Sequence, residues 1–149
     1  MELEIMGGVA FSVDGQDFDF PASWSYRGMM YSGLPNLVTI FGYINASWTL
    51  RSDIVGEWFC RLLQHMDRKG HRVVVPQPSV EEANSMQPRP WIEGFSAGYM
   101  QRLIHLFPRQ GDRSPWINSQ DYRREKSEFT AMSMDEAALH YPHSEAVEP

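Results

Sequence analysis

The chain has 149 residues, a net charge of −6 and a single cysteine, Cys60. The length suits one domain with its own hydrophobic core. The negative charge argues against nucleic acid and anionic membranes as partners, and one cysteine cannot build a disulfide framework or a cysteine-based zinc site. We find no signal peptide and no apolar run long enough for a transmembrane segment, so we expect a cytoplasmic protein.

The first predicted element is a β-hairpin over residues 1–20. Apolar and polar side chains alternate on both sides of Asp14-Gly15, a dipeptide typical of two-residue hairpin turns. This turn sets a register that places Ser12 opposite Asp17. The connector that follows, residues 21–32, is rich in aromatic residues and methionine. These side chains could line an apolar pocket, although a role as core filler is favoured.

The next predicted unit is a strand, a turn and a long helix. Residues 37–41 are apolar and β-branched, which predicts a strand covered on both faces. A small polar turn, residues 42–47, leads into a helix that Gly70 is expected to end. Its apolar side chains recur at every turn and form a broad arc. They are Ile54, Val55, Trp58, Phe59, Leu62, Leu63 and Met66.

The second half of the chain predicts shorter elements. Residues 72–75 read as a short strand, and Ser79 with Glu82 has the spacing of a helix capping box. Residues 96–107 predict a shorter helix that ends before Pro108. Three basic residues could bind a phosphate or simply be solvated. They are Arg102, Arg109 and Arg113.

Residues 123–149 are polar and acidic with no clear apolar period, which predicts a flexible, irregular C-terminal tail. His140 and His143 have a spacing that occurs in metal sites, but we expect no metal site from a histidine pair in a tail.

A strand, a glycine turn and a helix N-terminus form an arrangement that binds anions and cofactors in α/β proteins. The first-turn N–H groups are unpaired, and the helix dipole makes this end positive. The spacing alone favours an ordinary strand–turn–helix corner.

Residues 41–66, FGYINASWTLRSDIVGEWFCRLLQHM, resemble the closing strand and last long helix of the FAD domain in flavin-containing monooxygenases. The stretch is most similar to the Baeyer–Villiger-type branch that includes the ethionamide-activating enzymes. The resemblance continues through residues 14–37 upstream and 89–116 downstream, and then through residues 120–122. It fades after Tyr122, where the sequence Arg-Arg-Glu-Lys lacks the aspartate that family members tend to carry.

The resemblance implies an α/β fold, or α+β for an isolated fragment. Residues 1–122 would be the C-terminal part of the monooxygenase, an incomplete FAD-binding domain that contains the hairpin, the closing strand, the long helix and the short helix. Residues 123–149 would form the tail. The family uses FAD and NADPH to insert one oxygen atom into ketones or organosulfur compounds. The present sequence contains no G-x-G-x-x-G fingerprint. We therefore expect that this chain binds neither cofactor alone and is inactive alone.

The resemblance also implies cofactor-binding residues at the positive end of the long helix, where they would face the flavin. They are Gly42, Asn45, Ala46, Ser47 and Trp48. We expect no catalytic residue in the chain itself, because the chemistry belongs to the flavin. Three alternatives stay open: a truncated or split gene product, a subunit that needs a separate FAD- and NADP-binding chain, and a non-enzymatic interaction module.

Overall fold

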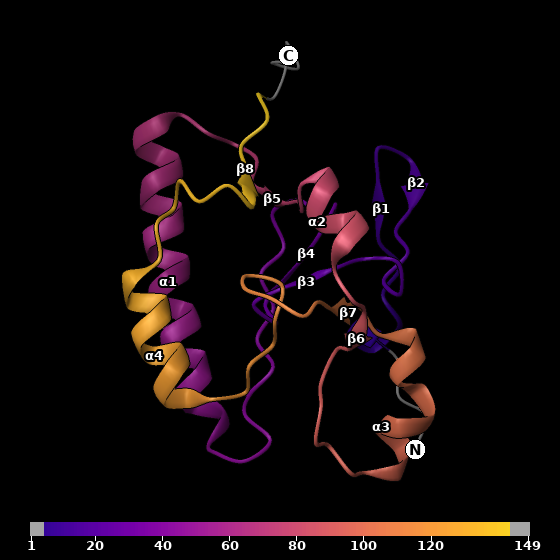
Figure 1. Cartoon of the computed structure of the whole chain (residues 1–149). Helices are drawn as coiled ribbons and strands as arrows, with labels where there is room; N and C mark the ends of the chain where they lie inside the picture. Colours follow the sequence, from indigo (N-terminus) through magenta and orange to yellow (C-terminus); the bar gives the residue numbers. More distant parts are fainter. Residues whose placement is uncertain (1–4, 144–149) are drawn as a thin grey trace.

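The computed structural model describes residues 5–143. Helices and short antiparallel strand pairs alternate along the chain, so the predicted mixed α/β class is confirmed. Two helices lie side by side at one edge of the molecule, and the strand pairs and short helices fill the rest (Figure 1). The helices are α1 Trp48–Lys69, α2 Val80–Ser85, α3 Gly98–Leu103 and α4 Tyr122–Ala131, with 3-10 turns η1 Ile5–Gly8 and η2 Ile104–Leu106.

Every strand of the described part belongs to a two-stranded antiparallel pair. The pairs are β1 Ser12–Val13 with β2 Gln16–Asp17, β3 Ser25–Tyr26 with β4 Met30–Tyr31, β5 Val75–Pro76 with β8 Leu139–His140, and β6 Arg89–Pro90 with β7 Arg109–Gln110. Ser12 pairs with Asp17, as the predicted turn requires. Residues 1–4 of the predicted hairpin lie outside the described residues.

Helix α1 is the main packing element, as predicted. Gly70 ends it in the left-handed conformation, at φ 70°, which glycine adopts without a Cβ penalty. Most of the predicted apolar arc is buried, with Trp58 and Leu62 almost fully enclosed. Two residues of the predicted arc are not buried, since Phe59 and Leu63 are 37% and 45% exposed. The described elements therefore cover only part of the arc.

The strand predicted over residues 37–41 is not formed, and this part of the fold prediction is wrong. The segment has no strand beside it with which to share a ladder. Its polar groups instead bond singly to other parts of the chain. The Thr39 N–H donates to the Met29 carbonyl at 2.8 Å, and the Phe41 carbonyl accepts from Arg51 Nη1 at 3.0 Å. Ile40 is left 45% exposed.

The flexible tail predicted after residue 122 is also corrected. Residues 122–131 form α4, whose N-cap Asp121 accepts from the Arg124 N–H at 3.1 Å. Glu125 and Phe129, four residues apart, are buried against the rest of the protein. The sequence of this helix shows no clear apolar period, because the carboxylate of Glu125 takes one of the two inward positions. Further on, β8 pairs with β5, and residues 144–149 of the predicted tail lie outside the described part.

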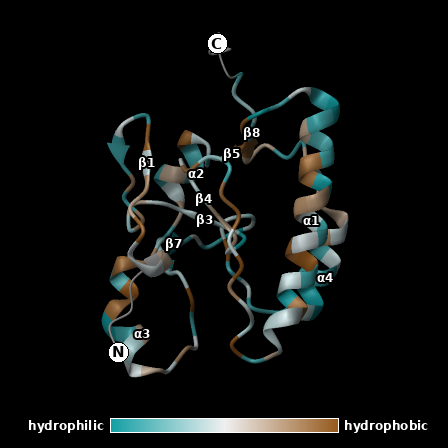
Figure 2. Ribbon diagram, turned by 180° about the vertical axis from the view of Figure 1, so that it is seen from behind, coloured by the Kyte–Doolittle hydropathy of each residue, from teal (hydrophilic) through white to brown (hydrophobic). Residues whose placement is uncertain are grey.

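The largest buried cluster lies between α1 and the β3–β4 pair, and it includes Trp58, Tyr26, Met29 and Trp116. A smaller cluster around Trp91 and Met100 lies near α3 and also takes in Phe41 and Ile44. The hydropathy colouring places apolar residues on the connecting segments as well as on α1 (Figure 2). The aromatic and methionine residues of the connector are thus core, as favoured, since Tyr26, Met29 and Met30 are all 0% exposed.

Candidate functional site at the start of helix α1

The residues expected to face a cofactor lie together in the corner that precedes and begins α1. Asn45, Ala46, Ser47 and Trp48 are exposed, whereas Gly42 is buried. Ser47 occupies the N-cap position with φ −63°, but its side chain caps no helix N–H. Its hydroxyl lies 2.8 Å from the Thr49 hydroxyl instead. The first-turn N–H groups therefore lack a side-chain cap at the positive end of the helix dipole, and the Leu50 N–H donates to the Ser47 carbonyl at 3.3 Å.

Gly42 lies beneath the first residue of α1. A Cβ built on Gly42 would overlap the Trp48 indole and would stand 2.8 Å from the Trp48 Cα. The indole is 53% exposed and packs against Phe41, with ring centroids 5.0 Å apart. A glycine at position 42 therefore allows the turn and the helix start to approach each other closely.

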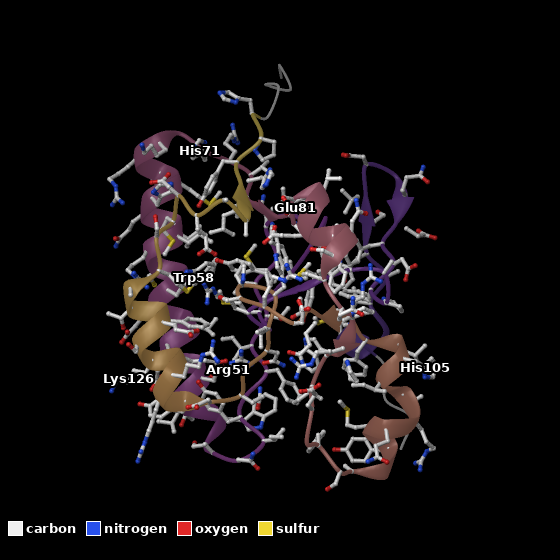
Figure 3. All side chains as sticks on the ribbon, in the orientation of Figure 1. Arg51, Trp58, His71, Glu81, His105 and Lys126 are labelled. Atoms are coloured by element: carbon white, nitrogen blue, oxygen red, sulfur yellow. The ribbon has the colours of Figure 1, made fainter. Side chains whose placement is uncertain are left out.

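A buried ion pair supports the inner side of this corner. Arg51, 1% exposed, donates to Glu125 through Nε at 3.1 Å and through Nη2 at 3.2 Å. The same guanidinium donates to two backbone carbonyls, those of Phe41 at 3.0 Å and Arg27 at 2.8 Å. Figure 3 shows Arg51 pointing from α1 into the interior. One side chain of α1 thus connects α4, the β3–β4 turn and the segment before the corner.

The carboxylate of Glu125 accepts two further hydrogen bonds. The Tyr43 hydroxyl donates at 2.6 Å and the Ser119 hydroxyl at 2.9 Å. Burial, followed by this bond to Glu125, raises the pKa of Tyr43 above its ordinary value, so its hydroxyl keeps the proton that it donates. A buried charge pair with this many partners holds its geometry tightly.

Gln120 closes the other side of the turn. Its Oε1 accepts from the Ile44 N–H at 2.9 Å, and its Nε2 donates to the Gly42 carbonyl at 3.2 Å. The sequence reasoning did not identify Arg51, Glu125 or Gln120. The sequence contains one signal that Arg51 is buried. Arg51 lies one turn before Ile54 and Val55, and so on the same side of α1 as these two apolar residues.

The basic residues considered for a phosphate do not form one anion site. The Arg109 guanidinium lies over the Trp24 ring at 4.1 Å, Arg113 pairs with Asp112 at 2.9 Å, and Arg102 is exposed on α3. Among residues 5–143, no three His, Cys, Asp or Glu side chains are grouped to hold a metal ion. No helix within that range is long and apolar enough to cross a membrane.

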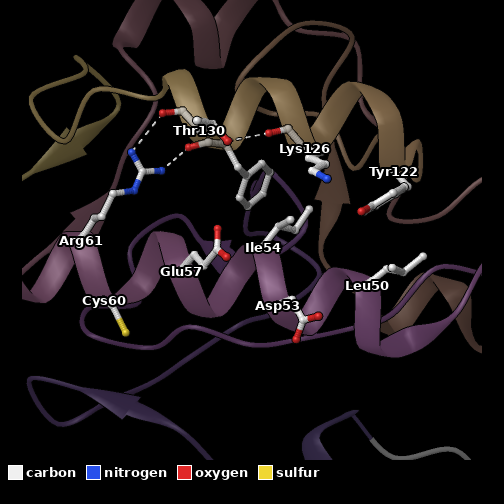
Figure 4. Close-up of a pocket in the computed structure, with 10 residues that line it drawn as sticks. Leu50, Asp53, Ile54, Glu57, Cys60, Arg61, Tyr122, Lys126 and Thr130 are labelled. Atoms are coloured by element: carbon white, nitrogen blue, oxygen red, sulfur yellow. Dashed lines mark hydrogen bonds between the residues drawn. The ribbon is translucent and has the colours of Figure 1, made fainter.

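A groove of about 710 Å³ follows the seam between α1 and α4 (Figure 4). Asp53 and Glu57 of α1 and Lys126 of α4 line it, as does Phe129 of α4. Arg61 donates to the carbonyls of Phe129 and Thr130, the latter at 3.2 Å, and so ties α1 to the end of α4. The groove is therefore a charged seam between packed helices, and its geometry indicates no particular chemistry.

Comparison with curated proteins identifies a group of relatives. The chain is 40% identical over 144 residues to the FAD-containing monooxygenase EthA of Mycobacterium tuberculosis. It is 35% identical over 141 residues to EthA of Mycolicibacterium smegmatis and 34% identical over 141 residues to the protein named "Probable FAD-binding monooxygenase AlmA" of Acinetobacter baylyi. Each match covers 95% of this chain but only 28% of the relative.

The matches therefore extend past Tyr122, since they cover 95% of the chain, and the expectation that the resemblance fades there is corrected. No family model matches the sequence, and no solved structure matches it.

Proposed function

This chain is homologous to part of the FAD-containing monooxygenases, and from that premise we propose that it serves as the C-terminal portion of an NADPH-dependent Baeyer–Villiger-type monooxygenase. The complete enzyme would insert one oxygen atom into ketones or organosulfur compounds. The observation that carries the proposal is the identity of 33–40% over 95% of the chain. The chain spans about a quarter of the relatives' length, 28%, so the activity would require sequence beyond the matched region. A cytoplasmic location is part of the proposal.

The corner before α1 suits one edge of a flavin. Its exposed, uncapped helix N-terminus offers backbone N–H groups and the positive end of a dipole. Asn45, Ala46, Ser47 and Trp48 would meet the ring there, and Gly42 would let the turn stay close to the helix. When bound, FAD would supply the redox chemistry of oxygen transfer.

The chain's own contribution would be positioning. The Arg51–Glu125 pair and Gln120 bind the corner from within, so the donors on its outer side are already fixed before a ligand arrives. Such preorganisation lowers the cost of stabilising negative charge as it develops. The described residues include no dinucleotide cradle, so the pyrophosphate of FAD and the NADPH would be held by a separate portion or chain.

Two alternatives have one observation in their favour. Phe59 and Leu63 leave an apolar strip of α1 exposed, which also suits a non-enzymatic interaction module or a split subunit. The main proposal and the split subunit both require a partner that brings FAD, whereas the partner of a non-enzymatic interaction module would bring none.

The test is complementation. The 149-residue chain would be produced alone and together with the part of EthA that lies outside the matched region. Alone, we expect no flavin absorption at about 450 nm. Together, we expect bound FAD and ketone-dependent oxidation of NADPH, with the EthA part alone as control. Stoichiometric FAD in the isolated chain would contradict the need for a partner. A soluble complex without FAD would favour the interaction module.

A further inference from the structure

Three amide side chains, those of Gln110, Asn118 and Gln120, form a hydrogen-bonded row that reaches the corner before α1, and we call them the amide relay. Gln110 and Asn118 are 1% and 5% exposed. The Asn118 Oδ1 accepts from Nε2 of Gln120 at 3.3 Å, and Gln120 bonds to the turn before α1. We propose that Asn118 is a positioning residue for this corner, which acts by fixing the orientation of the Gln120 amide.

The partners of Asn118 fix the orientation of its own amide. Its Nδ2 donates to the Trp91 carbonyl at 3.1 Å, and a carbonyl oxygen can only accept a hydrogen bond. The NH2 group of Asn118 therefore points to Trp91, which leaves Oδ1 for Gln120. Gln110 holds the backbone at the same place, because its Oε1 accepts from the Asn118 N–H at 2.9 Å while its Nε2 donates to the Pro90 carbonyl at 2.8 Å.

The orientation of Gln120 follows from that of Asn118. Because Oδ1 of Asn118 is an acceptor, the atom of Gln120 that faces it must be the donor Nε2. The same Nε2 donates to the Gly42 carbonyl at 3.2 Å, and the remaining Oε1 accepts from the Ile44 N–H at 2.9 Å. With the Gln120 amide reversed, two donors would meet at Ile44 and two acceptors at Gly42. The turn would then lose both bonds.

The amide relay and the Arg51–Glu125 pair hold different parts of the corner. The Arg51 guanidinium bonds to the backbone at the Phe41 carbonyl, whereas Gln120 bonds to the backbone at Gly42 and Ile44. The relay therefore connects the turn to the segment around Trp91, which the ion pair does not contact through a hydrogen bond. A role of Asn118 toward flavin rests on the proposed function, but its coupling to the turn does not.

The first experiment measures amide hydrogen exchange by NMR in the ¹⁵N-labelled chain without flavin. Asn118→Leu removes both polar groups of the side chain at similar size, so the Gln120 amide loses the contact that orients it. We expect exchange of the Ile44 N–H to accelerate about two- to tenfold, the effect of one hydrogen bond. Exchange of the Asn36 N–H, which donates to the Val74 carbonyl at 2.9 Å, should stay constant. Unchanged exchange at Ile44 would overturn the proposal.

Ser25→Ala is the matched control, because it removes a buried hydrogen bond to Trp91 that lies outside the amide relay. The Ser25 hydroxyl accepts from the Trp91 indole Nε1 at 3.2 Å, whereas Asn118 bonds to the Trp91 carbonyl. This variant should leave exchange at Ile44 unchanged. Equal acceleration in Ser25→Ala and Asn118→Leu would overturn the proposal, since it would follow from loosening Trp91 alone.

A double-mutant cycle tests whether Asn118 acts through Gln120. Gln120→Leu removes both bonds to the turn and should by itself accelerate exchange of the Ile44 N–H. Adding Asn118→Leu to this variant should then have no further effect at Ile44. An additive acceleration would overturn the proposal.

Gln120→Glu keeps the proposal testable if Asn118→Leu does not fold, because residue 120 is only half-buried. A glutamate keeps an oxygen for the Ile44 N–H but offers no donor to Oδ1 of Asn118. Exchange at Ile44 should therefore stay slow, while the NMR signals of the Asn118 side-chain NH2 group should shift. Unshifted Asn118 signals would overturn the proposal.

The complemented enzyme separates this proposal from the proposed function. Asn118→Leu should shift the absorption band of bound FAD, because the corner is then held less firmly, and Ser25→Ala should leave the band in place. Failure of complementation, with the effect at Ile44 present, would refute only the proposed function. A band that shifts equally in both variants, or in neither, would refute the positioning role of Asn118.

Discussion

The inner and outer sides of the corner before α1 differ in how their polar groups are satisfied. On the inner side, Arg51 and Glu125 are 1% and 3% exposed and are hydrogen-bonded to each other. Glu125 also accepts from the hydroxyls of Tyr43 and Ser119. On the outer side, Ser47 caps no helix N–H and the neighbouring residues are exposed. The comparison teaches that buried polar contacts fix the corner from within, whereas the start of the helix on its outer side has no side-chain cap.

The largest effect should come from breaking the inner side. Glu125→Ala leaves the Arg51 guanidinium buried without its carboxylate, which should lower the free energy of unfolding by about 3–5 kcal/mol. Urea denaturation measures this difference. The matched control is Arg124→Ala on the same helix, because Arg124 pairs with Glu128 at 2.6 Å and has a side chain that is 51% exposed. That variant should lose about 0–1 kcal/mol, and similar losses in both would contradict the comparison.

A smaller effect should follow from removing one hydroxyl of the inner side. Tyr43→Phe deletes the hydrogen bond to Glu125 and should cost about 1.5–3 kcal/mol at neutral pH, as is usual for bonds to charged groups. The variant should also change the response to alkaline pH.

The sign of that pH dependence follows from the raised pKa of Tyr43. The folded chain keeps the phenolic proton at a pH where the unfolded chain, with its ordinary pKa of 10.0, has lost it. This contribution to stability is therefore complete below pH 10 and is lost as the pH rises further. Tyr43→Phe should flatten the loss of stability above about pH 10 without abolishing it, because burial raises the pKa of Tyr26 and Tyr31 as well. Parallel curves for the two proteins would refute this role of Tyr43.

The smallest effect on stability should come from the outer side. Ser47→Pro suits the observed φ of −63° and should change the free energy of unfolding by less than about 0.5 kcal/mol. Ser52→Pro, inside α1, is the control and should cost about 3 kcal/mol or more. In the complemented enzyme, Ser47→Pro should nevertheless shift the flavin absorption band. An unchanged spectrum would argue that the outer side does not face the ring.

Local sequence patterns were sufficient to predict the elements that are specified by their own residues. The Asp14-Gly15 turn set the register of the hairpin, and Ser79 with Glu82 forms both bonds of the predicted capping box. The apolar spacing and Gly70 gave the extent of α1 to its last turn. Each of these signals acts within a few residues, so one sequence can reveal it.

The sequence by itself thus determined the hairpin, the long helix, its glycine stop and the resemblance to flavin-containing monooxygenases. Only the tertiary structure decided that residues 37–41 pair with no strand, that 122–131 form a helix, and that Arg51 meets Glu125 across 74 positions. The physical reason is that a buried charge is stable only beside its partner. Taken singly, Arg51 and Glu125 resemble solvated surface residues, and their burial follows from packing α4 against α1.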